Sequence, residues 1–390
     1  MRGRTRKILI LIEPVIQKKS NSKGLKIEQN KPVRIKDIAD KAGVSVGTVD
    51  RVLHKRGRVS SESVKKVKDA LVLLDYEPNI IARGLGSKNT FNLAVIVPEY
   101  DKDSYWRSQV KGVLIALKQL KDFGFSIEIL TFSVSIENDL LKHKASVSNL
   151  KFDALLLAPV VSDNSHELMD LSNELGIPYL LINTNLERAD NNCLGFVGQD
   201  SLQSGKLGAK LLSLMTSPDS QLGILHMEKE FEKSYHMIQK QKGFLAYFQK
   251  GGHQDKDIVV DHLDLSLSDK SVLVKSISNF LIKNKRLKGI FVTTSRMHFL
   301  VEVLNKLERS DIVLVGYDLI KENIDALSKY DQLVLINQNP ERQAFQGIMS
   351  LFEHLFNKKE ISKSQYLPMD IITKENISAY IQSDNSLHSF

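Results

Sequence analysis

Hydrophobic residues between positions 33 and 76 recur at the spacing of α-helices, in three short runs. Gly43 follows the first run and can take the positive φ that ends a helix. Ser45 can cap the second helix, and Ser60 or Ser61 can cap the third. The apolar stripes are Ile35, Ile38, Ala39 and Ala42, then Val49, Val52 and Leu53, then Val64, Val67, Ala70, Leu71 and Leu74. The pattern predicts a compact three-helix unit, and its short glycine-containing first turn is typical of a helix-turn-helix.

From residue 91 the pattern changes to short aliphatic runs that alternate with amphipathic helical stretches. The predicted strands are 93–98, 126–130, 153–159, 178–183, 222–227, 288–294, 311–318 and 333–338, and the predicted helices between them include 107–122, 164–175, 201–215, 233–250 and 296–308. Such alternation builds parallel sheets covered by helices on both faces, with ligands at the carboxyl ends of the strands. The length of this part exceeds one ordinary domain, so two lobes are expected.

The positive charge of the chain is concentrated at its amino end. Residues 1–90 contain 21 Lys and Arg against 9 Asp and Glu, a net charge of +12, and the remaining residues carry 33 against 37, a net charge of −4. This asymmetry predicts a module that binds a polyanion, joined to a nearly neutral body. The single cysteine, Cys193, excludes an internal disulfide.

Membrane and enzyme classes find little support in the sequence. The apolar run at 8–12 is interrupted by Glu13 and Pro14, and no run approaches the roughly 18 residues that span a bilayer. We therefore expect residues 1–32 to be a basic flexible leader. The ten histidines lack zinc-binding spacing, and no nucleophile elbow occurs, so the chain is expected to have no catalytic residues, no metal and no cofactor.

The segment "RIKDIADKAGVSVGTVDRVLHKRGRVSSESVKKVKDALVLLDYEPNIIARGL" resembles the DNA-binding head and hinge of the LacI/GalR (lactose-repressor-like) transcription factors. The resemblance implies an all-α helix-turn-helix head with a hinge helix, joined to a two-lobed α/β effector domain of the periplasmic-binding-protein type I-like fold. The implied bounds are 33–78 for the head, 79–89 for the hinge and 90–383 for the effector and dimerisation domain. Within that domain, lobe 1 is expected at about 90–200 and 339–357, and lobe 2 at about 201–338 and 358–383.

The second helix of the head is the expected reader of DNA. Burial of its apolar stripe turns Val46, Gly47, Thr48 and Arg51 outward, where a helix can meet base edges in the major groove. The resemblance implies that Val46, Gly47 and Arg51 read base edges, whereas Thr48, His54 and Arg58 lie close to the backbone. Asp50 departs from the family's small polar residue; it orients Arg51, is merely solvated, or accepts a hydrogen bond from cytosine N4.

Residues 79–86 match the family's hinge helix, which implies DNA contacts for Ala82 and for Leu85 as the minor-groove wedge. Gly84 and Gly86 each cost about 1 kcal/mol of helix propensity relative to alanine. The segment is therefore expected to fold on DNA, or else to be a plain flexible linker.

Effector contacts are expected at the carboxyl ends of the strands. Asp103, Tyr105 and Trp106 follow the first strand, where an aromatic ring beside polar groups suits a sugar, although Trp106 suits the core or a dimer surface equally well. The resemblance implies further contacts from Asn183, Lys240, Thr294, Arg296, Asp318 and Gln338. Lys240 stands where arginine is customary, and "TTSR" at 293–296 replaces an Ala-Asn-Asp-like pattern, so a modified or charged sugar, or another small molecule, is expected.

The sequence thus predicts a cytoplasmic bacterial transcription regulator, expected to be a repressor. Its expected partners are double-stranded operator DNA, a carbohydrate-like effector and a second copy of the chain, as a homodimer or a higher oligomer. The alternative is a ligand-binding sensor of the same fold without specific DNA binding, which Gly47 and Asp50 favour. No membrane partner is expected.

Overall fold

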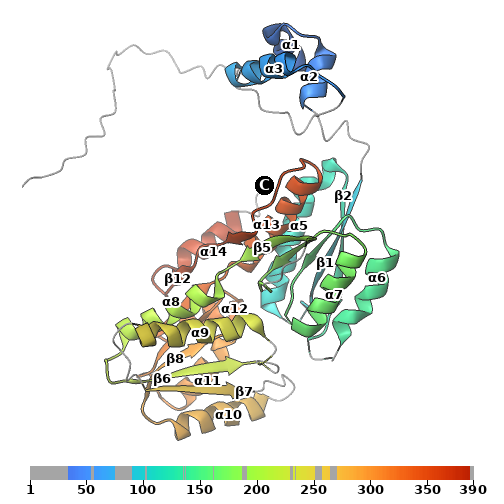
Figure 1. Cartoon of the computed structure of the whole chain (residues 1–390). Helices are drawn as coiled ribbons and strands as arrows, with labels where there is room; N and C mark the ends of the chain where they lie inside the picture. Colours follow the sequence, from blue (N-terminus) through green and yellow to red (C-terminus); the bar gives the residue numbers. More distant parts are fainter. Residues whose placement is uncertain are drawn as a thin grey trace, which may run out of the picture. The chain divides into compact units, whose positions relative to one another are not determined.

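The computed structural model describes residues 34–53, 57–74, 90–101, 103–134, 136, 138–160, 162–186, 191–228, 232, 234–250, 257–263 and 270–386. The chain divides into two compact units, Met1–Ile80 and Ile81–Phe390, each of which is described by itself (Figure 1). The expected leader at 1–32 and hinge at 79–89 lie outside the described residues, and so do His54, Ala82 and Leu85.

The first unit contains the three predicted helices, α1 (Ile35–Ala42), α2 (Val46–Leu53) and α3 (Ser61–Leu73). Gly43 ends α1 with a φ of 64°, in the left-handed region that glycine adopts without strain. The Ser45 hydroxyl accepts a hydrogen bond from the Thr48 amide, and the Ser60 hydroxyl accepts one from the Ser63 amide. The predicted cap at Ser45 is therefore confirmed, and of Ser60 and Ser61 it is Ser60 that caps α3. The buried core comprises Ile38, Ala39, Ala42, Val49, Val67 and Ala70, and the other residues of the predicted stripes are partly buried.

Two six-stranded sheets form the second unit, and their strand orders are equivalent. The first sheet has the order β11-β5-β4-β3-β1-β2 and the second β12-β10-β9-β8-β6-β7. Every strand pairs in parallel with its neighbours except β12, which is antiparallel to β10. In each sheet the first strand along the chain lies between the second and third, which is the topology that places ligands at the carboxyl ends.

Lobe 1 is the first sheet with the helices that cover it, and lobe 2 is the second. Lobe 1 comprises β1 (Phe91–Pro98), α5 (Ser104–Leu120), η1 (Lys121–Phe123), β2 (Phe125–Phe132), η2 (Asp139–Lys142), α6 (His143–Asn149), β3 (Ala154–Leu157), α7 (Ser162–Glu174), β4 (Tyr179–Ile182), β5 (Cys193–Gly198), α13 (Pro340–Leu355) and β11 (Ser364–Tyr366). Lobe 2 comprises α8 (Ser201–Met215), β6 (Gln221–Met227), α9 (Tyr235–Lys250), β7 (Ile258–Leu263), α10 (Lys270–Lys283), β8 (Leu287–Val292), α11 (Met297–Lys306), β9 (Val313–Tyr317), α12 (Lys321–Leu327), β10 (Leu333–Asn337), β12 (Asp370–Ile372) and α14 (Ile377–Ser386).

One predicted boundary is wrong. The whole of 358–383 was expected in lobe 2, but β11 pairs in parallel with β5 and is an edge strand of the lobe 1 sheet. A three-residue polar strand carries no hydrophobic periodicity, so its partner is set by main-chain pairing alone. The chain therefore passes between the lobes at three places, 198–201, 338–339 and 367–369, which we call the crossovers.

Alternate residues of each central strand enter opposite layers of the core. In β1, Leu93, Val95 and Val97 pack on the side of α5 and α13, whereas Ala94 and Ile96 pack on the side of α6 and α7. In β6, Leu225 and Met227 pack with α10 and α11, whereas Ile224 packs with α8 and α9. Figure 1 shows these helices on the two faces of their sheets. The predicted α/β architecture is confirmed.

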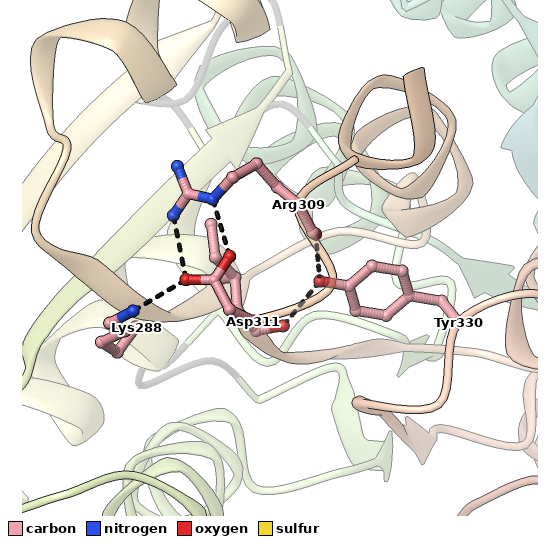
Figure 2. Close-up of polar contacts among 5 residues, drawn as sticks. Lys288, Arg309, Asp311 and Tyr330 are labelled. Atoms are coloured by element: carbon pink, nitrogen blue, oxygen red, sulfur yellow. Dashed lines mark hydrogen bonds and ion pairs between the residues drawn. The ribbon is translucent and has the colours of Figure 1, made fainter. Parts of the chain in front are cut away.

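Polar contacts fix the opposite, amino-terminal edge of the lobe 2 sheet. Asp311 accepts hydrogen bonds from the Arg309 guanidinium at 2.7 and 3.3 Å and from Lys288 Nζ at 2.8 Å (Figure 2). These bonds hold the pKa of the Asp311 carboxyl well below its usual range. The Tyr330 hydroxyl lies 2.9 Å from the Arg309 carbonyl and 2.8 Å from that of Ile312 (Figure 2). The entry to β9 is therefore anchored to β8 and to the turn before β10.

Helices α8 and α9 cross backbone against backbone, because glycine lies at the contact on both sides. A Cβ added to Gly205 would lie 1.9 Å from the Lys240 carbonyl oxygen, and one added to Gly243 would lie 2.0 Å from that of Leu202. No side chain fits at either position without separation of the helices. The crossing fixes the backbone of α9 at Lys240.

We expect Gly243→Ala to lower the urea midpoint of unfolding. Alanine gains about 1 kcal/mol of helix propensity over glycine. Overpacking a close contact costs about 1–3 kcal/mol, however, and here the added Cβ would clash with a main-chain oxygen that cannot rotate away. Lys242→Ala, at the exposed neighbouring position of α9, is the control and should change the stability by no more than about 0.5 kcal/mol. Equal midpoints for the two variants would contradict the close crossing.

Candidate functional site

The amino-terminal turn of α2 exposes a small surface on the helical unit. Val46 is 49% exposed although it is aliphatic, and Gly47 and Arg51 are exposed beside it. A Cβ on Gly47 would lie 3.9 Å from Arg51 Nη2, so the guanidinium leans over the glycine. The described residues thus combine a methyl-bearing side chain at the start of α2 with the five-donor guanidinium of Arg51 from the last turn of the same helix. This combination suits base edges in a major groove.

The remaining described positions of this surface lie around Arg51. Gly57 has a φ of 69°, and a Cβ built there would lie 3.6 Å from Arg51 Cδ. Arg58 is exposed next to it. Thr48 is partly covered, and its hydroxyl lies 2.9 Å from the Ser45 hydroxyl. The surface therefore carries two arginines within one turn and loop, where phosphate oxygens can be bound.

Left-handed backbone marks the carboxyl ends of three strands in the α/β unit. Asn183 follows β4 with a φ of 68°, Asp318 follows β9 with 70°, and Asn339 follows β10 with 52°. Non-glycine residues adopt this conformation uncommonly, and asparagine and aspartate tolerate it best. Asn183 and Asp318 direct buried polar side chains toward the edge where the two lobes meet, whereas the Asn339 side chain caps α13 by accepting a hydrogen bond from the Arg342 amide.

The lobe 1 part of this edge is built on Tyr105. Its hydroxyl donates a 2.6 Å hydrogen bond to Asn183 Oδ1. Burial, and after it the negative charge of Asp318, raises the pKa of Tyr105 well above the usual range. The Asp103 side chain caps α5 by accepting hydrogen bonds from the amides of Tyr105 and Trp106. Trp106 packs edge-on against Tyr105 at 5.1 Å and belongs to the core of lobe 1. Asp103 and Trp106 thus orient Tyr105.

The lobe 2 part is a chain of three buried side chains, which we call the Lys240 relay: Lys240, Gln338 and Asp318. Lys240 Nζ donates to Gln338 Oε1 at 3.3 Å and to the Thr293 carbonyl at 3.1 Å, and it lies 3.5 Å from the centre of the Tyr317 ring. Gln338 in turn donates to Asp318 from its side-chain nitrogen at 2.8 Å and from its main-chain amide at 3.1 Å. The relay joins the ends of β8, β9 and β10.

Burial shifts both charged members of the relay toward neutrality. Lys240 and Asp318 are each only 1% exposed. Loss of hydration lowers the pKa of Lys240 to about 7 and raises that of Asp318 to about 6, and each charge partly opposes the shift of the other. An amine and a carboxyl group with such pKa values next to a polar cluster are typical of functional sites.

Thr294 and Arg296, the two effector contacts expected at the carboxyl end of β8, lie in different surroundings. Arg296 lies 3.4 Å from the Glu228 carboxylate, and its side chain is 16% exposed. Thr294 Oγ1 is buried and makes no hydrogen bond to any described residue. The Arg296 charge is therefore balanced by Glu228, whereas the Thr294 hydroxyl has no described partner and follows Thr293, whose carbonyl accepts from Lys240.

Several residues of this edge were not anticipated from the sequence. Gln343 Nε2 donates to the Gln338 carbonyl at 2.8 Å, and Gln109 Nε2 donates to Gln343 at 3.3 Å. The Thr184 hydroxyl of lobe 1 lies 3.1 Å from His236 Nδ1 of lobe 2, and burial lowers the pKa of that imidazole to about 3. Gln109 and His236 lie one helical turn from the predicted residues Tyr105 and Lys240, Thr184 directly follows Asn183, and Gln343 comes five residues after Gln338. This closeness in sequence is the only signal that could have pointed to them.

His226 of β6 contacts Thr293, whose carbonyl accepts a hydrogen bond from Lys240. Its ring nitrogens lie 2.8 Å from the Thr293 hydroxyl and 2.6 Å from Gln241 Oε1, so Nε2 carries the proton and Nδ1 accepts. The ring is fully buried, and burial lowers its pKa to about 4.

The described residues contain no group of three or more His, Cys, Asp or Glu that could hold a metal ion. No helix in that part of the chain is long and apolar enough to cross a bilayer.

Comparison with known proteins gives matches to both units. Residues 34–79 match the family described as bacterial regulatory proteins, lacI family, and residues 93–359 match the periplasmic binding protein domain. The HTH-type transcriptional regulator RegA of Clostridium saccharobutylicum is 26% identical over 353 residues, which are 88% of this chain and 98% of that protein.

Two solved structures are also similar. A LacI transcriptional regulator from Bacteroides fragilis is 29% identical with a TM-score of 0.68, over 75% of this chain and all of that one. The transcriptional regulator CelR in complex with cellobiose is 19% identical with a TM-score of 0.58, over 87% of this chain and 98% of that one. At that identity the second likeness shows the fold alone.

We expect His226→Gln to reduce the loss of stability in acid. The unfolded imidazole binds a proton below pH 6.5 and the folded one only below about pH 4, so in this window stability rises with pH and is lost as the pH falls. The shift corresponds to at most about 3 kcal/mol. Urea midpoints between pH 4 and 7 should fall less steeply in the variant, and an unchanged slope would contradict a buried neutral His226.

Proposed function

Because this chain belongs to the lacI family of bacterial regulatory proteins and carries their periplasmic-binding-protein domain, it is a DNA-binding transcriptional regulator and not an enzyme, and we propose that a carbohydrate-like effector bound between its lobes controls operator binding. The observation that most directly supports the effector site is the convergence of Tyr105, Asn183, Gln338 and Asp318 at the carboxyl edges of the two sheets. Strand ends of this topology are where such folds bind small molecules.

DNA recognition is proposed for the surface of α2. Arg51 would read guanine through a bidentate contact to O6 and N7, and Val46 would contact a thymine methyl group. Gly47 leaves room for close approach of the helix, and Thr48 and Arg58 would contact phosphates. His54, Ala82 and Leu85 complete the proposed DNA contacts. Because phosphate contacts release counterions, operator affinity should fall steeply with salt.

Effector recognition is proposed for the edge where the lobes meet. Each oxygen of Asp318 accepts one hydrogen bond from Gln338 and keeps a further lone pair, which suits a pair of sugar hydroxyls. Asn183, Gln338 and Thr294 would add neutral donors and acceptors, and Tyr105 or Trp106 an aromatic face. CelR, whose structure holds cellobiose, shares this fold and motivates a carbohydrate as the effector class.

Coupling between the sites requires two arrangements of the lobes. An effector changes operator affinity only as far as it binds one arrangement more tightly than the other. We propose that the protein acts as a repressor in the cytoplasm, as a homodimer on a near-palindromic operator, because a two-fold pair of heads matches a two-fold site.

Arg51→Ala should abolish operator preference and leave effector binding intact. Loss of a bidentate guanine contact costs about 1–3 kcal/mol of discrimination, so selection from a random duplex pool should no longer enrich one sequence. Fluorescence anisotropy with the enriched duplex and a scrambled one measures the change. If wild-type protein binds both duplexes equally, the sensor function without specific DNA binding is the better description.

Asp318→Asn should abolish the effector response and leave operator affinity unchanged. The introduced amide group places donors opposite the Gln338 donors, and it removes the anion that accepts sugar hydroxyls. Thermal-shift screening of the wild type with mono- and disaccharides identifies a ligand, and operator release with that ligand is then compared in both proteins. Normal release by the variant would contradict the proposed site.

A further inference from the structure

We propose that Lys240 is a positioning residue that holds Gln338 and Asp318 in place, that it offers no positive charge to the effector, and that the effector is therefore a neutral sugar and not a sugar acid or sugar phosphate. The inference rests on the proposed carbohydrate-binding function and assigns the charge class of its ligand. It also gives Lys240 a different role from the effector contact expected from its place in the sequence.

All three directions available to the Lys240 ammonium are occupied by the protein. Two are hydrogen bonds, to the Thr293 carbonyl and to Gln338 Oε1, and the third is the face of the Tyr317 ring. An ammonium has three donors and no acceptor, so these contacts use its full capacity. The side chain is 1% exposed, and the Gly205 contact fixes its backbone against α8. The charge is directed into lobe 2.

The contact to Gln338 determines which way round that amide lies. Because Oε1 accepts from the ammonium, Nε2 must point the other way, and there it donates to Asp318 Oδ2 at 2.8 Å. Reversal of the amide would place a donor against a donor at Lys240 and an acceptor against a carboxylate at Asp318. One buried cation thus orients the carboxylate that is proposed to accept the effector hydroxyls.

The other charged groups near this edge also disfavour an anion. Arg296, the second cation expected to contact effector, is paired with Glu228. Burial keeps His236 neutral, because its pKa is lowered to about 3. Asp318 and Asp103 both face Tyr105 and raise its pKa, so their negative charges act on the same place. A carboxylate or phosphate on the effector would add a further negative charge beside Asp318 and Asp103 in a poorly hydrated site.

The first test compares ligands that share a carbon skeleton and differ in charge. Wild-type protein is titrated calorimetrically with glucose, glucuronate and glucose 6-phosphate, and with galactose, galacturonate and galactose 6-phosphate, alongside cellobiose. In any series that binds, we expect the neutral sugar to bind at least 10-fold more tightly than its acidic derivatives. An acidic derivative that binds more tightly than its neutral parent would overturn the proposal.

The second test separates positioning from direct contact. In Lys240→Met, or in Lys240→Gln if the first variant does not fold, affinities for the neutral sugar and for its acid should fall by the same factor. Their ratio should stay as in the wild type. If Lys240 instead pairs with the effector, the acid alone should lose affinity, and the ratio would change. Lys242→Met, at the exposed position two residues along α9, is the control and should leave both affinities unchanged.

The third test needs no effector and so stands apart from the proposed function. Urea midpoints are measured for Lys240→Met, for Gln338→Leu and for the double variant. If Lys240 acts through Gln338, the double variant should lose less than the sum of the two single losses, whereas Lys242→Met and Gln338→Leu should add. Additive losses at Lys240 and Gln338 would overturn the positioning role. If no sugar in the panel binds, the proposed effector class fails while this cycle still decides the role of Lys240.

Discussion

A buried cation and a buried carboxylate, joined through one glutamine amide, determine the geometry of the carboxyl edge of lobe 2. Neither charge can be removed alone without leaving the other uncompensated in a site of low polarity. The hydrogen-bonding requirement of Lys240 therefore extends through Gln338 to Asp318, and from the Gln338 main chain to Gln343 in lobe 1. The polar groups of the proposed effector site thus satisfy one another's hydrogen bonds and hold one another in place.

The lobes contribute unequal halves to this edge. Lobe 2 supplies the charged relay, while lobe 1 supplies the neutral pair Tyr105 and Asn183. Besides the bond from Gln343 to the Gln338 carbonyl, side-chain hydrogen bonds among the described residues cross between the lobes from the Ser104 hydroxyl to the Glu322 carboxylate and between Thr184 and His236. The contact of Ser104 with Glu322 is exposed to solvent and is therefore screened and weak, whereas the contact between Thr184 and His236 is partly buried and is screened less.

The head could be predicted from its sequence nearly residue by residue, because caps and apolar spacing act locally: Gly43, Ser45 and Ser60 each end or begin the helix that they were expected to. The alternation of strands and helices could also be predicted from the hydrophobic pattern, but that pattern did not predict β5, β7, β11 and β12. Their sequences are short or mixed, and their places are set by pairing with distant strands. Side chains of the candidate site could be predicted because they follow the predicted strands directly in the sequence. The direction of the Lys240 ammonium could not, because it depends on a helix crossing at Gly205 between segments far apart in the sequence.

All three connections between the lobes meet at one side chain. Gln199 lies in the first crossover, and its Nε2 donates to the Asn337 carbonyl at 2.7 Å, at the start of the second, and to the Pro368 carbonyl at 3.1 Å, within the third. Both hydrogens of that amide are used, while its oxygen is buried and has no partner among the described residues. Because one amide bonds to both of the other connections, the three crossovers are tied into a single unit that any turning of the lobes has to preserve or break.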